Sequence, residues 1–258
     1  MFDLSGRVAV VTGGSSGIGE AICCRFGKAG ATVVNLDRVA PREYDFPCIQ
    51  ADVSHEAELS GALEEVVTTH GALHILVNTA GIQPLGVGFD DLTSALLRRT
   101  FEVNVDGVAL GIKHAARLME SGGRILNCAS FVGTIGVPGG TAYAASKAAV
   151  AHLTRCAAVE LAPRNITVNA VAPGTVRTPA VTGIPDNPEI PFVERRTPLG
   201  RLAEPDEIAG VFHFLASGEA SYVTGAVIPA DGGITAGWER YDLVPPAEIE
   251  DGRWNDDL

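Results

Sequence analysis

Three side chains of this sequence have the chemistry to move a proton together: Ser130, Tyr143 and Lys147. Tyr143 and Lys147 stand at i and i+4 in an alanine-rich stretch that predicts a helix, so both would project from one helix face. A free tyrosine has a pKa of about 10 and is a poor acid or base at neutral pH. A neighbouring lysine cation is expected to lower that pKa. Taken alone, the pair is equally compatible with a half-buried surface tyrosine beside a lysine.

A glycine-rich turn, residues 12–19, follows the first expected strand and opens the first expected helix. Backbone N–H groups at a helix N-terminus suit a pyrophosphate, and glycines let the chain approach it closely. The spacing of Gly13, Gly17 and Gly19 departs from the GxGxxG fingerprint, but the position between strand and helix still favours a dinucleotide site. The expected contacts are Gly13, Ser15, Ser16, Gly17, Ile18 and Gly19.

Asp37 ends the second expected strand, where a carboxylate can accept hydrogen bonds from ribose hydroxyls and repel a 2′-phosphate. Arg38 beside it could instead pair with such a phosphate. We expect the carboxylate to dominate, so the sequence predicts NAD in preference to NADP.

Apolar runs that are typical of buried strands alternate with longer helical stretches. This alternation predicts a single α/β domain over residues 1–236, with a doubly wound, Rossmann-like parallel sheet and helices on both faces. The expected strands are 7–12, 32–37, 47–52, 74–78, 123–129, 165–171 and 227–230, and the expected helices are 19–29, 56–70, 93–118, 141–161 and 205–216.

Two segments depart from this alternation. Residues 173–199 are rich in proline and predict a mobile loop with room for a short helix. Residues 237–258 form an acidic C-terminal tail. Its aromatic residues Trp238, Tyr241 and Trp254 favour packing on the body or on a partner subunit over full solvation.

Composition narrows the functional classes. A net charge of −12 without a basic stripe argues against a nucleic-acid partner. No apolar run approaches the length of a membrane span, and no secretory signal is recognisable. The five scattered cysteines are expected to be reduced thiols in the cytoplasm, and the six histidines form no ligand pattern, so no metal is expected.

With these features in view, the chain resembles the short-chain dehydrogenase/reductase family from its first strand to about Gly233. The usual family motif Asn-Asn-Ala-Gly has Thr79 at its second position here. The resemblance rests on residues 12–19, Asp52-Val53, Asn78-Thr79-Ala80-Gly81, Asn104, Ser130, Tyr143, Lys147 and residues 173–178.

The resemblance implies a role for each of these side chains. Tyr143 would be the general acid/base, and Lys147 would lower its pKa and hold the nicotinamide ribose. Ser130 would orient the substrate oxygen, and Asn104 would fix a water in a proton relay. The cofactor would contact Asp52 and Val53 at the adenine, Asn78, Ala80 and Gly81 along the adenosine and ribose, and Pro173, Gly174, Val176 and Thr178 near the nicotinamide, with Thr178 on its carboxamide.

These inferences predict a hydride transfer between NAD(H) and a secondary alcohol or ketone. The segments expected at the substrate pocket, 83–85, 131–138 and 181–192, are largely apolar, which favours a neutral, apolar or cyclic substrate. An NADP-linked ketoreductase, a non-catalytic dinucleotide-binding regulator and a scaffold role are the alternatives. The family usually forms homotetramers or homodimers, for which the helices at 93–118 and 141–161 would supply the interface.

Overall fold

The computed structural model describes residues 2–41 and 46–237, and a parallel sheet of seven strands lies at its centre. The strands run in the order β3-β2-β1-β4-β5-β6-β7, and every neighbouring pair is parallel. This arrangement confirms the predicted doubly wound α/β fold. The strands are β1 (Val8–Thr12), β2 (Thr32–Asp37), β3 (Cys48–Gln50), β4 (Ile75–Asn78), β5 (Arg124–Cys128), β6 (Thr167–Pro173) and β7 (Val227–Ala230).

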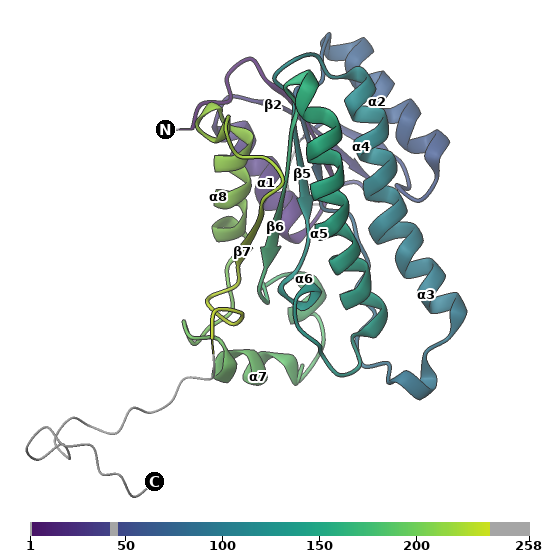
Figure 1. Ribbon diagram of the computed structural model, residues 1–258, viewed down its shortest axis with the longest axis vertical. Coiled ribbons are helices and arrows are strands. Elements are labelled where there is room, and N and C mark those ends of the chain that lie inside the picture. Colours follow the sequence, from purple (N-terminus) through teal and green to yellow (C-terminus); the bar gives the residue numbers. More distant parts are fainter. Residues whose placement is uncertain (1, 42–45, 238–258) are drawn as a thin grey trace, which may run out of the picture.

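Successive side chains of a strand point to opposite faces of the sheet. Because the strands are apolar at successive positions, both faces of the sheet are apolar. Val8 and Val10 of β1 pack into one core cluster, and Ala9 and Val11 pack into the other. The first cluster lies under α2 (Glu56–His70), α4 (Gly107–Leu118) and α5 (Thr141–Leu161). The second lies under α1 (Gly17–Lys28) and α8 (Pro205–Ala216), on the other side of the sheet (Figure 1).

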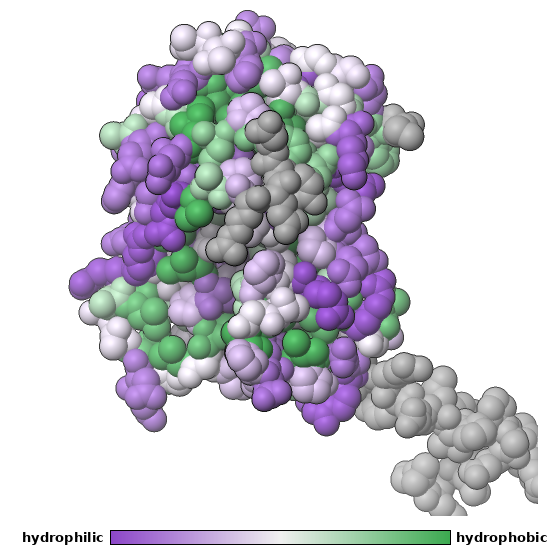
Figure 2. All heavy atoms as spheres, turned by 180° about the vertical axis from the view of Figure 1, so that it is seen from behind, coloured by the Kyte–Doolittle hydropathy of each residue, from purple (hydrophilic) through white to green (hydrophobic). Residues whose placement is uncertain are grey.

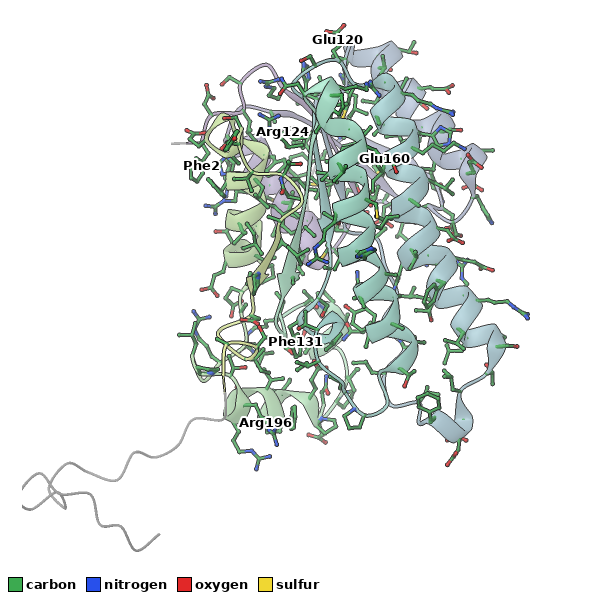
Figure 3. The ribbon with its side chains drawn as sticks, in the orientation of Figure 1. Phe2, Glu120, Arg124, Phe131, Glu160 and Arg196 are labelled. Atoms are coloured by element: carbon green, nitrogen blue, oxygen red, sulfur yellow. The ribbon has the colours of Figure 1, made fainter. Side chains whose placement is uncertain are left out.

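The strand order reverses between β1 and β4. From β1 the chain continues through α1 to β2 on one side, whereas β4 pairs on the other side. A crevice at the carboxyl ends of the strands is expected at such a reversal. Figure 3 shows Phe131 at this end of the sheet and Arg124 toward the opposite end.

The helix expected over residues 93–118 is interrupted. It consists of α3 (Ser94–Phe101), a π-helical turn at Glu102–Asp106 and α4. Asn104 lies in this turn, and its side chain bonds both the N–H and the carbonyl of Ile82. A single π turn of this kind is a recurrent feature of functional sites.

The segment 173–199 contains more regular structure than the sequence predicted. It contains the end of β6 and two helices, α6 (Pro179–Thr182) and α7 (Glu189–Arg196). Pro179 opens α6, where its missing N–H costs no hydrogen bond. Val181, Val193 and Leu202 form a small buried cluster that holds the two helices together. Spaced apolar residues that looked unconnected in sequence therefore build a third, minor core.

The acidic tail prediction concerns residues 237–258, of which all but Gly237 lie outside the described residues. Across 2–41 and 46–237, no helix combines the length and the apolarity that crossing a membrane requires.

Candidate active site

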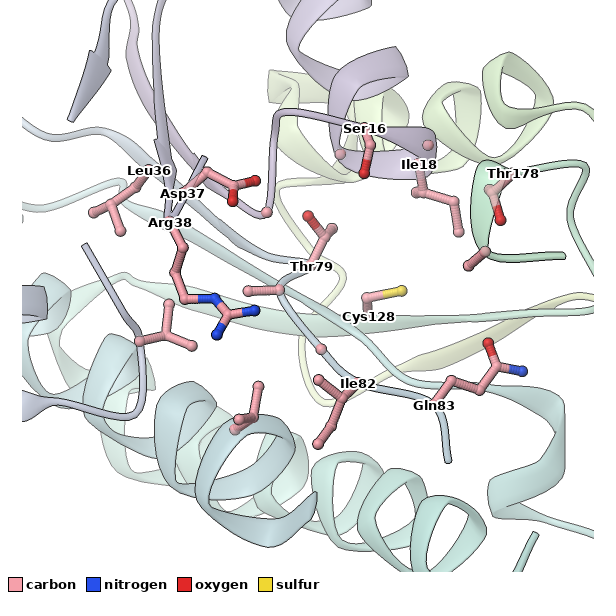
Figure 4. A pocket seen from close by; sticks show the side chains of 18 of the residues that line it. Ser16, Ile18, Leu36, Asp37, Arg38, Thr79, Ile82, Gln83, Cys128 and Thr178 are labelled. Atoms are coloured by element: carbon pink, nitrogen blue, oxygen red, sulfur yellow. The ribbon is translucent and has the colours of Figure 1, made fainter. Parts of the chain in front are cut away.

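A cavity of about 340 Å³ opens at the carboxyl ends of the strands, where the glycine turn, β2, β4, β5 and α5 converge. In Figure 4, Asp37 and Arg38 lie at one end of it, and Gln83 and Thr178 lie at the other. The sequence-predicted residues that line it are Gly13, Ser16, Gly17, Ile18, Gly19, Asp37, Asp52, Val53, Ala80, Gly81, Tyr143, Lys147 and Thr178.

The glycine turn is shaped by close backbone contact. Gly13 has φ +71°, and a Cβ there would lie 2.8 Å from the Cα of Ala80. Helix α1 begins at Gly17, and the N-cap residue Ser16 makes no side-chain capping bond. The first N–H groups of a helix have no intrahelical partner. The turn therefore fits a dinucleotide pyrophosphate in both shape and polarity.

Two threonines lock this turn to the segment after β4. The Thr12 hydroxyl oxygen accepts hydrogen bonds from the N–H groups of Thr79 and Ala80, each at 3.2 Å. The Thr79 hydroxyl in turn donates to the Thr12 carbonyl. Thr79, which departs from the family motif, thus has a definite structural role and also lines the cavity.

Asp37 is held by the backbone around it. Its carboxylate accepts hydrogen bonds from the N–H groups of Ser15, at 3.1 Å, and Val39, at 3.2 Å. The Ser15 hydroxyl donates to the Val39 carbonyl, so this side chain is turned toward the end of β2. Ser15 was predicted to contact the cofactor but is not among the residues that line the cavity.

Asp52 carries the other carboxylate at this end of the cavity. Burial by itself would raise the pKa of Asp52, but hydrogen bonds from Ser54 and the charges of Arg99 and Arg38 outweigh it and lower that pKa. Arg99 lies 3.4 Å and Arg38 lies 3.8 Å from the Asp52 carboxylate. Asp52 is therefore an anion at neutral pH, and it engages Arg38, the residue that could have favoured a 2′-phosphate.

Tyr143 and Lys147 lie together at the other end, beside the last residue of β5. The side chain of Lys147 is buried, and its ammonium donates a 2.7 Å hydrogen bond to the Cys128 carbonyl. The Lys147 nitrogen is 5.7 Å from the centre of the Tyr143 ring. Burial lowers the pKa of Lys147, because the charged form is deprived of water.

One expectation about this pair is wrong for the protein alone. The sequence predicted a lowered pKa for Tyr143, but burial raises it, and nearby Cys128 and Glu189 act in the same direction. A hydrogen bond with Ser130 opposes these effects without overcoming them. The physical reason is that removing a phenolate from water costs more than this hydrogen bond returns. In this state Tyr143 is a proton donor.

Asn78 does not line the cavity, contrary to the role that the resemblance implied. It is buried, and its amide nitrogen donates to the Asn127 side chain at 2.9 Å. Asn127 in turn donates to the Thr154 hydroxyl at 2.9 Å. These buried hydrogen bonds join β4 and β5 to α5. They hold α5, which carries Tyr143 and Lys147, in position along the sheet.

Asn104 is likewise completely buried and lies behind the cavity wall. Besides its two bonds to Ile82, it donates to the Ser146 hydroxyl at 3.0 Å. These bonds occupy its amide group. Asn104 thereby braces the segment next to Lys147, and its role toward a relay water stays a prediction.

The residues after β6 act mainly by shaping the chain. A Cβ on Gly174 would lie 2.9 Å from the backbone of Asp231, and Val176 is buried and pairs with Ala203. Thr178 then projects into the cavity, with its methyl group over Gly17. Pro173, Gly174 and Val176, like Ser130, are not among the lining residues.

The lining also includes residues that sequence reasoning did not assign to the dinucleotide site. Most are neighbours of assigned residues, so their chain position was a usable signal. Arg99 is the exception, because nothing in the sequence connects α3 to Asp52. The lining residues that were not assigned to the dinucleotide site are Leu36, Arg38, Ala51, Thr79, Ile82, Gln83, Arg99, Val103, Cys128, Pro179 and Ala180. In the described part of the chain, no group of three or more His, Cys, Asp or Glu side chains could hold a metal.

The amino-acid sequence is similar to those of known dehydrogenases and reductases. Residues 13–235 match a family model described as enoyl-(acyl carrier protein) reductase. The chain is 41% identical to cis-4-hydroxycyclohexanecarboxylate dehydrogenase of Sinomonas cyclohexanicum, over 89% of this chain and 97% of that protein. It is 40% identical to galactitol 2-dehydrogenase of Rhizobium johnstonii, over 91% and 97% of the two chains.

A solved structure extends the similarity to the fold. The ligand-free aldohexose dehydrogenase of Thermoplasma acidophilum superposes with a TM-score of 0.87 at 32% identity, covering 95% of this chain and 99% of that one.

Proposed function

Because the chain belongs to the short-chain dehydrogenase/reductase family, we propose that it transfers a hydride between NAD(H) and a neutral secondary alcohol or ketone. The family relationship makes it an oxidoreductase that uses a nicotinamide dinucleotide. The choice of NAD and the substrate class are the finer parts of the proposal.

One observation carries this proposal: Tyr143 and Lys147 line the same cavity as the glycine turn and Asp37. The proton-transfer groups and the dinucleotide cradle belong to one site. The glycine turn would hold the pyrophosphate and Asp37 the adenosine ribose. Lys147 would hold the nicotinamide ribose and Thr178 the carboxamide.

A nicotinamide dinucleotide held in this cavity would supply or accept the hydride. Tyr143 supplies the proton to the carbonyl oxygen during reduction and takes it back during oxidation. Ser130 is buried and is hydrogen-bonded to the Tyr143 phenol. Both side chains can therefore hydrogen-bond to the same substrate oxygen. These two groups stabilise the charge that develops on that oxygen.

As an ammonium, Lys147 would place a positive charge next to the phenol. One of its three N–H donors is used by the Cys128 carbonyl, which leaves two for the ribose or for a water. The raised pKa of Tyr143 keeps its phenol protonated at neutral pH, so Tyr143 carries the proton that reduction of a carbonyl needs. Oxidation needs the phenolate, so its rate should increase as the pH rises.

The preference for NAD rests on Asp37. Two backbone N–H groups hold its carboxylate at the cavity, where it can accept hydrogen bonds from ribose hydroxyls. Arg38 favours the rival NADP, but it lies 3.8 Å from Asp52, which compensates its charge. Kinetics with both cofactors test the point, and a strong preference for NADP would refute it.

A neutral and partly apolar substrate is supported by the surface near the site. Leu85, Ile135, Ile184 and Phe192 are exposed hydrophobic residues of the segments that follow β4, β5 and β6. The face seen in Figure 2 carries hydrophilic residues along its flanks and hydrophobic ones between them and toward its lower end. Of the relatives named above, two act, by their names, on an uncharged sugar alcohol and a sugar, and the third acts on a hydroxylated ring that carries a carboxylate.

The decisive experiment is a screen for NAD reduction over secondary alcohols, cyclic alcohols, diols and polyols. We expect turnover on at least one cyclic alcohol or polyol. A protein that binds NADH, seen as a rise in Tm, but turns over none of them would be the non-catalytic regulator. A protein whose Tm is unchanged by NADH would favour the scaffold role.

We also propose a homotetramer or homodimer that uses α4 and α5, in a reducing cytoplasm. Val159 of α5 is an exposed hydrophobic residue on one of these helices. The five cysteines are free thiols. Light scattering during size-exclusion chromatography tests the assembly, and a monomer at micromolar concentration would contradict it.

A further inference from the structure

Helix α7 crosses the carboxyl end of the sheet (Figure 1), and hydrogen bonds hold both the side chain and the backbone of its first residue, Glu189. The Thr175 hydroxyl donates a 2.9 Å hydrogen bond to the Glu189 carboxylate. Thr175 is buried and lies two residues after the end of β6, so this hydrogen bond fixes the Glu189 carboxylate at the carboxyl end of the sheet.

The backbone of Glu189 is anchored as well. The Asn187 side chain accepts a 3.0 Å bond from the Glu189 N–H and donates a 2.9 Å bond to the Val181 carbonyl of α6. The preceding residues of α6, Pro179 and Ala180, line the dinucleotide cavity. Glu189 is thus connected on one side to β6 and on the other to the cavity wall.

The Glu189 carboxylate is close enough to the Tyr143 phenol for its charge to raise the pKa of that phenol. It is one of the groups whose charge disfavours the Tyr143 phenolate. The other titratable groups around this phenol are Cys128 from β5, a buried thiol, and Lys147 from α5. Arg195 and Arg196 lie in the last turn of α7, about 9 Å farther along the helix axis. Arg196 is positioned over the Phe192 ring.

We propose that Glu189 is a specificity-determining residue, whose fixed carboxylate makes this site select neutral alcohols and reject those that carry a carboxylate. The inference rests on the proposed function. It separates this chain from its relative whose named substrate is a hydroxycyclohexanecarboxylate. Two negative charges close together at a partly buried position repel each other more strongly than they do in bulk water. A hydroxyl group, in contrast, could donate a hydrogen bond to the free carboxylate oxygen.

The test compares cis-4-hydroxycyclohexanecarboxylate with its carboxamide, which has nearly the same shape but no charge. For the unaltered protein we expect kcat/KM to be at least about tenfold higher for the carboxamide. Glu189→Gln should reduce this ratio to about threefold or less, while Glu189→Asp should largely retain it. Glu194→Gln, on the same helix, is the matched control and should leave the ratio unchanged. A ratio that survives Glu189→Gln, or an unaltered protein that prefers the carboxylate, overturns the proposal.

A pH profile distinguishes this electrostatic role from a structural one. Loss of the Glu189 charge should move the rise of kcat/KM for oxidation to lower pH, and Glu194→Gln should not move it. An unmoved profile in Glu189→Gln would contradict the proposal.

If the unaltered protein turns over neither compound nor any alcohol, the proposed function fails. Binding still decides the role of Glu189. Calorimetry with cyclohexanecarboxylate and cyclohexanecarboxamide on the NADH-loaded protein should show tighter binding of the carboxamide. Glu189→Gln should remove that difference, and an unchanged difference would count against the proposal.

Discussion

The Lys147 ammonium donates its hydrogen bond to the main-chain carbonyl of Cys128, at 2.7 Å. This contact joins the first turns of α5 to the end of β5, and it holds the buried Lys147 nitrogen beside Tyr143. The acceptor is backbone, so the lysine position is set by the sheet.

Lys147→Met should therefore lower turnover without lowering the stability of the fold to a similar degree. We expect kcat to fall by at least about 10²-fold, because the charge that supports the phenolate is lost. Stability should change little, since the loss of the hydrogen bond to the Cys128 carbonyl and the removal of a costly buried charge act in opposite directions. Lys113→Met, at an exposed lysine bonded to Glu56, should leave kcat unchanged. Steady-state kinetics and Tm check both, and normal turnover in Lys147→Met would refute its role.

Tyr143→Phe should lower turnover by about 10²–10⁴-fold, the usual contribution of a positioned acid/base. The phenyl ring fills the same space, so the NADH-induced rise in Tm should persist. Undiminished turnover on the best alcohol would remove Tyr143 from the mechanism.

Asp37→Asn should shift cofactor selectivity toward NADP. The amide has no charge to repel a 2′-phosphate, and Arg38 remains nearby. We expect the ratio of kcat/KM for NAD to that for NADP to fall by at least about tenfold. Asp90→Asn, at an exposed residue of the short helix at Phe89–Asp91, is the control. Selectivity that is unaltered in Asp37→Asn would show that other residues decide it.

Gly13→Ala should weaken both folding and NADH binding. The new Cβ would lie 2.8 Å from the Cα of Ala80, at a positive φ of +71°. Gly61 in α2 offers the opposite case, because a Cβ there would meet nothing within 4 Å. Gly61→Ala should stabilise the protein by about 0.5–1 kcal/mol. Urea unfolding measures both variants, and equal effects would contradict the packing argument.

Glu207 is expected to stabilise the protein at neutral pH and to lose this effect in acid. Two hydrogen bonds from Arg201, and then the Glu204 N–H, lower the pKa of Glu207 from 4.5 to about 2. Because its folded pKa is depressed, its contribution to stability is complete above about pH 4.5 and is lost as the pH falls toward 2. Glu207→Gln should lower Tm at pH 7, and the difference from the unaltered protein should disappear near pH 2. Glu65→Gln, on an exposed face of α2, should change Tm little at either pH.

Much of this site could be predicted because its signals are local. The glycine turn, Asp37 and Tyr143 with Lys147 all follow strands or open helices, and parallel strands bring their carboxyl ends to one edge. The resemblance added Asp52, Val53 and Thr178, which line the cavity as implied.

What sequence reasoning missed has a common cause, namely contacts between segments far apart in sequence. Asn78 and Asn104 are polar residues whose spacing did not reveal their buried partners, Asn127 and Ile82. The two helices after β6 depend on the small core around Val193, which forms only when α6 and α7 meet.

The amino-acid sequence by itself determined the order of strands and helices along the chain and the place of the glycine turn, because periodicity and local backbone preference encode them, and the resemblance to a family added the predicted roles of Tyr143 and Lys147. Only the tertiary structure decided how those groups behave. Burial reversed the expected direction of the Tyr143 pKa, and the packing of α7 brought the Glu189 charge to the site. Desolvation and long-range electrostatics depend on distances in space, which spacing along the chain does not contain.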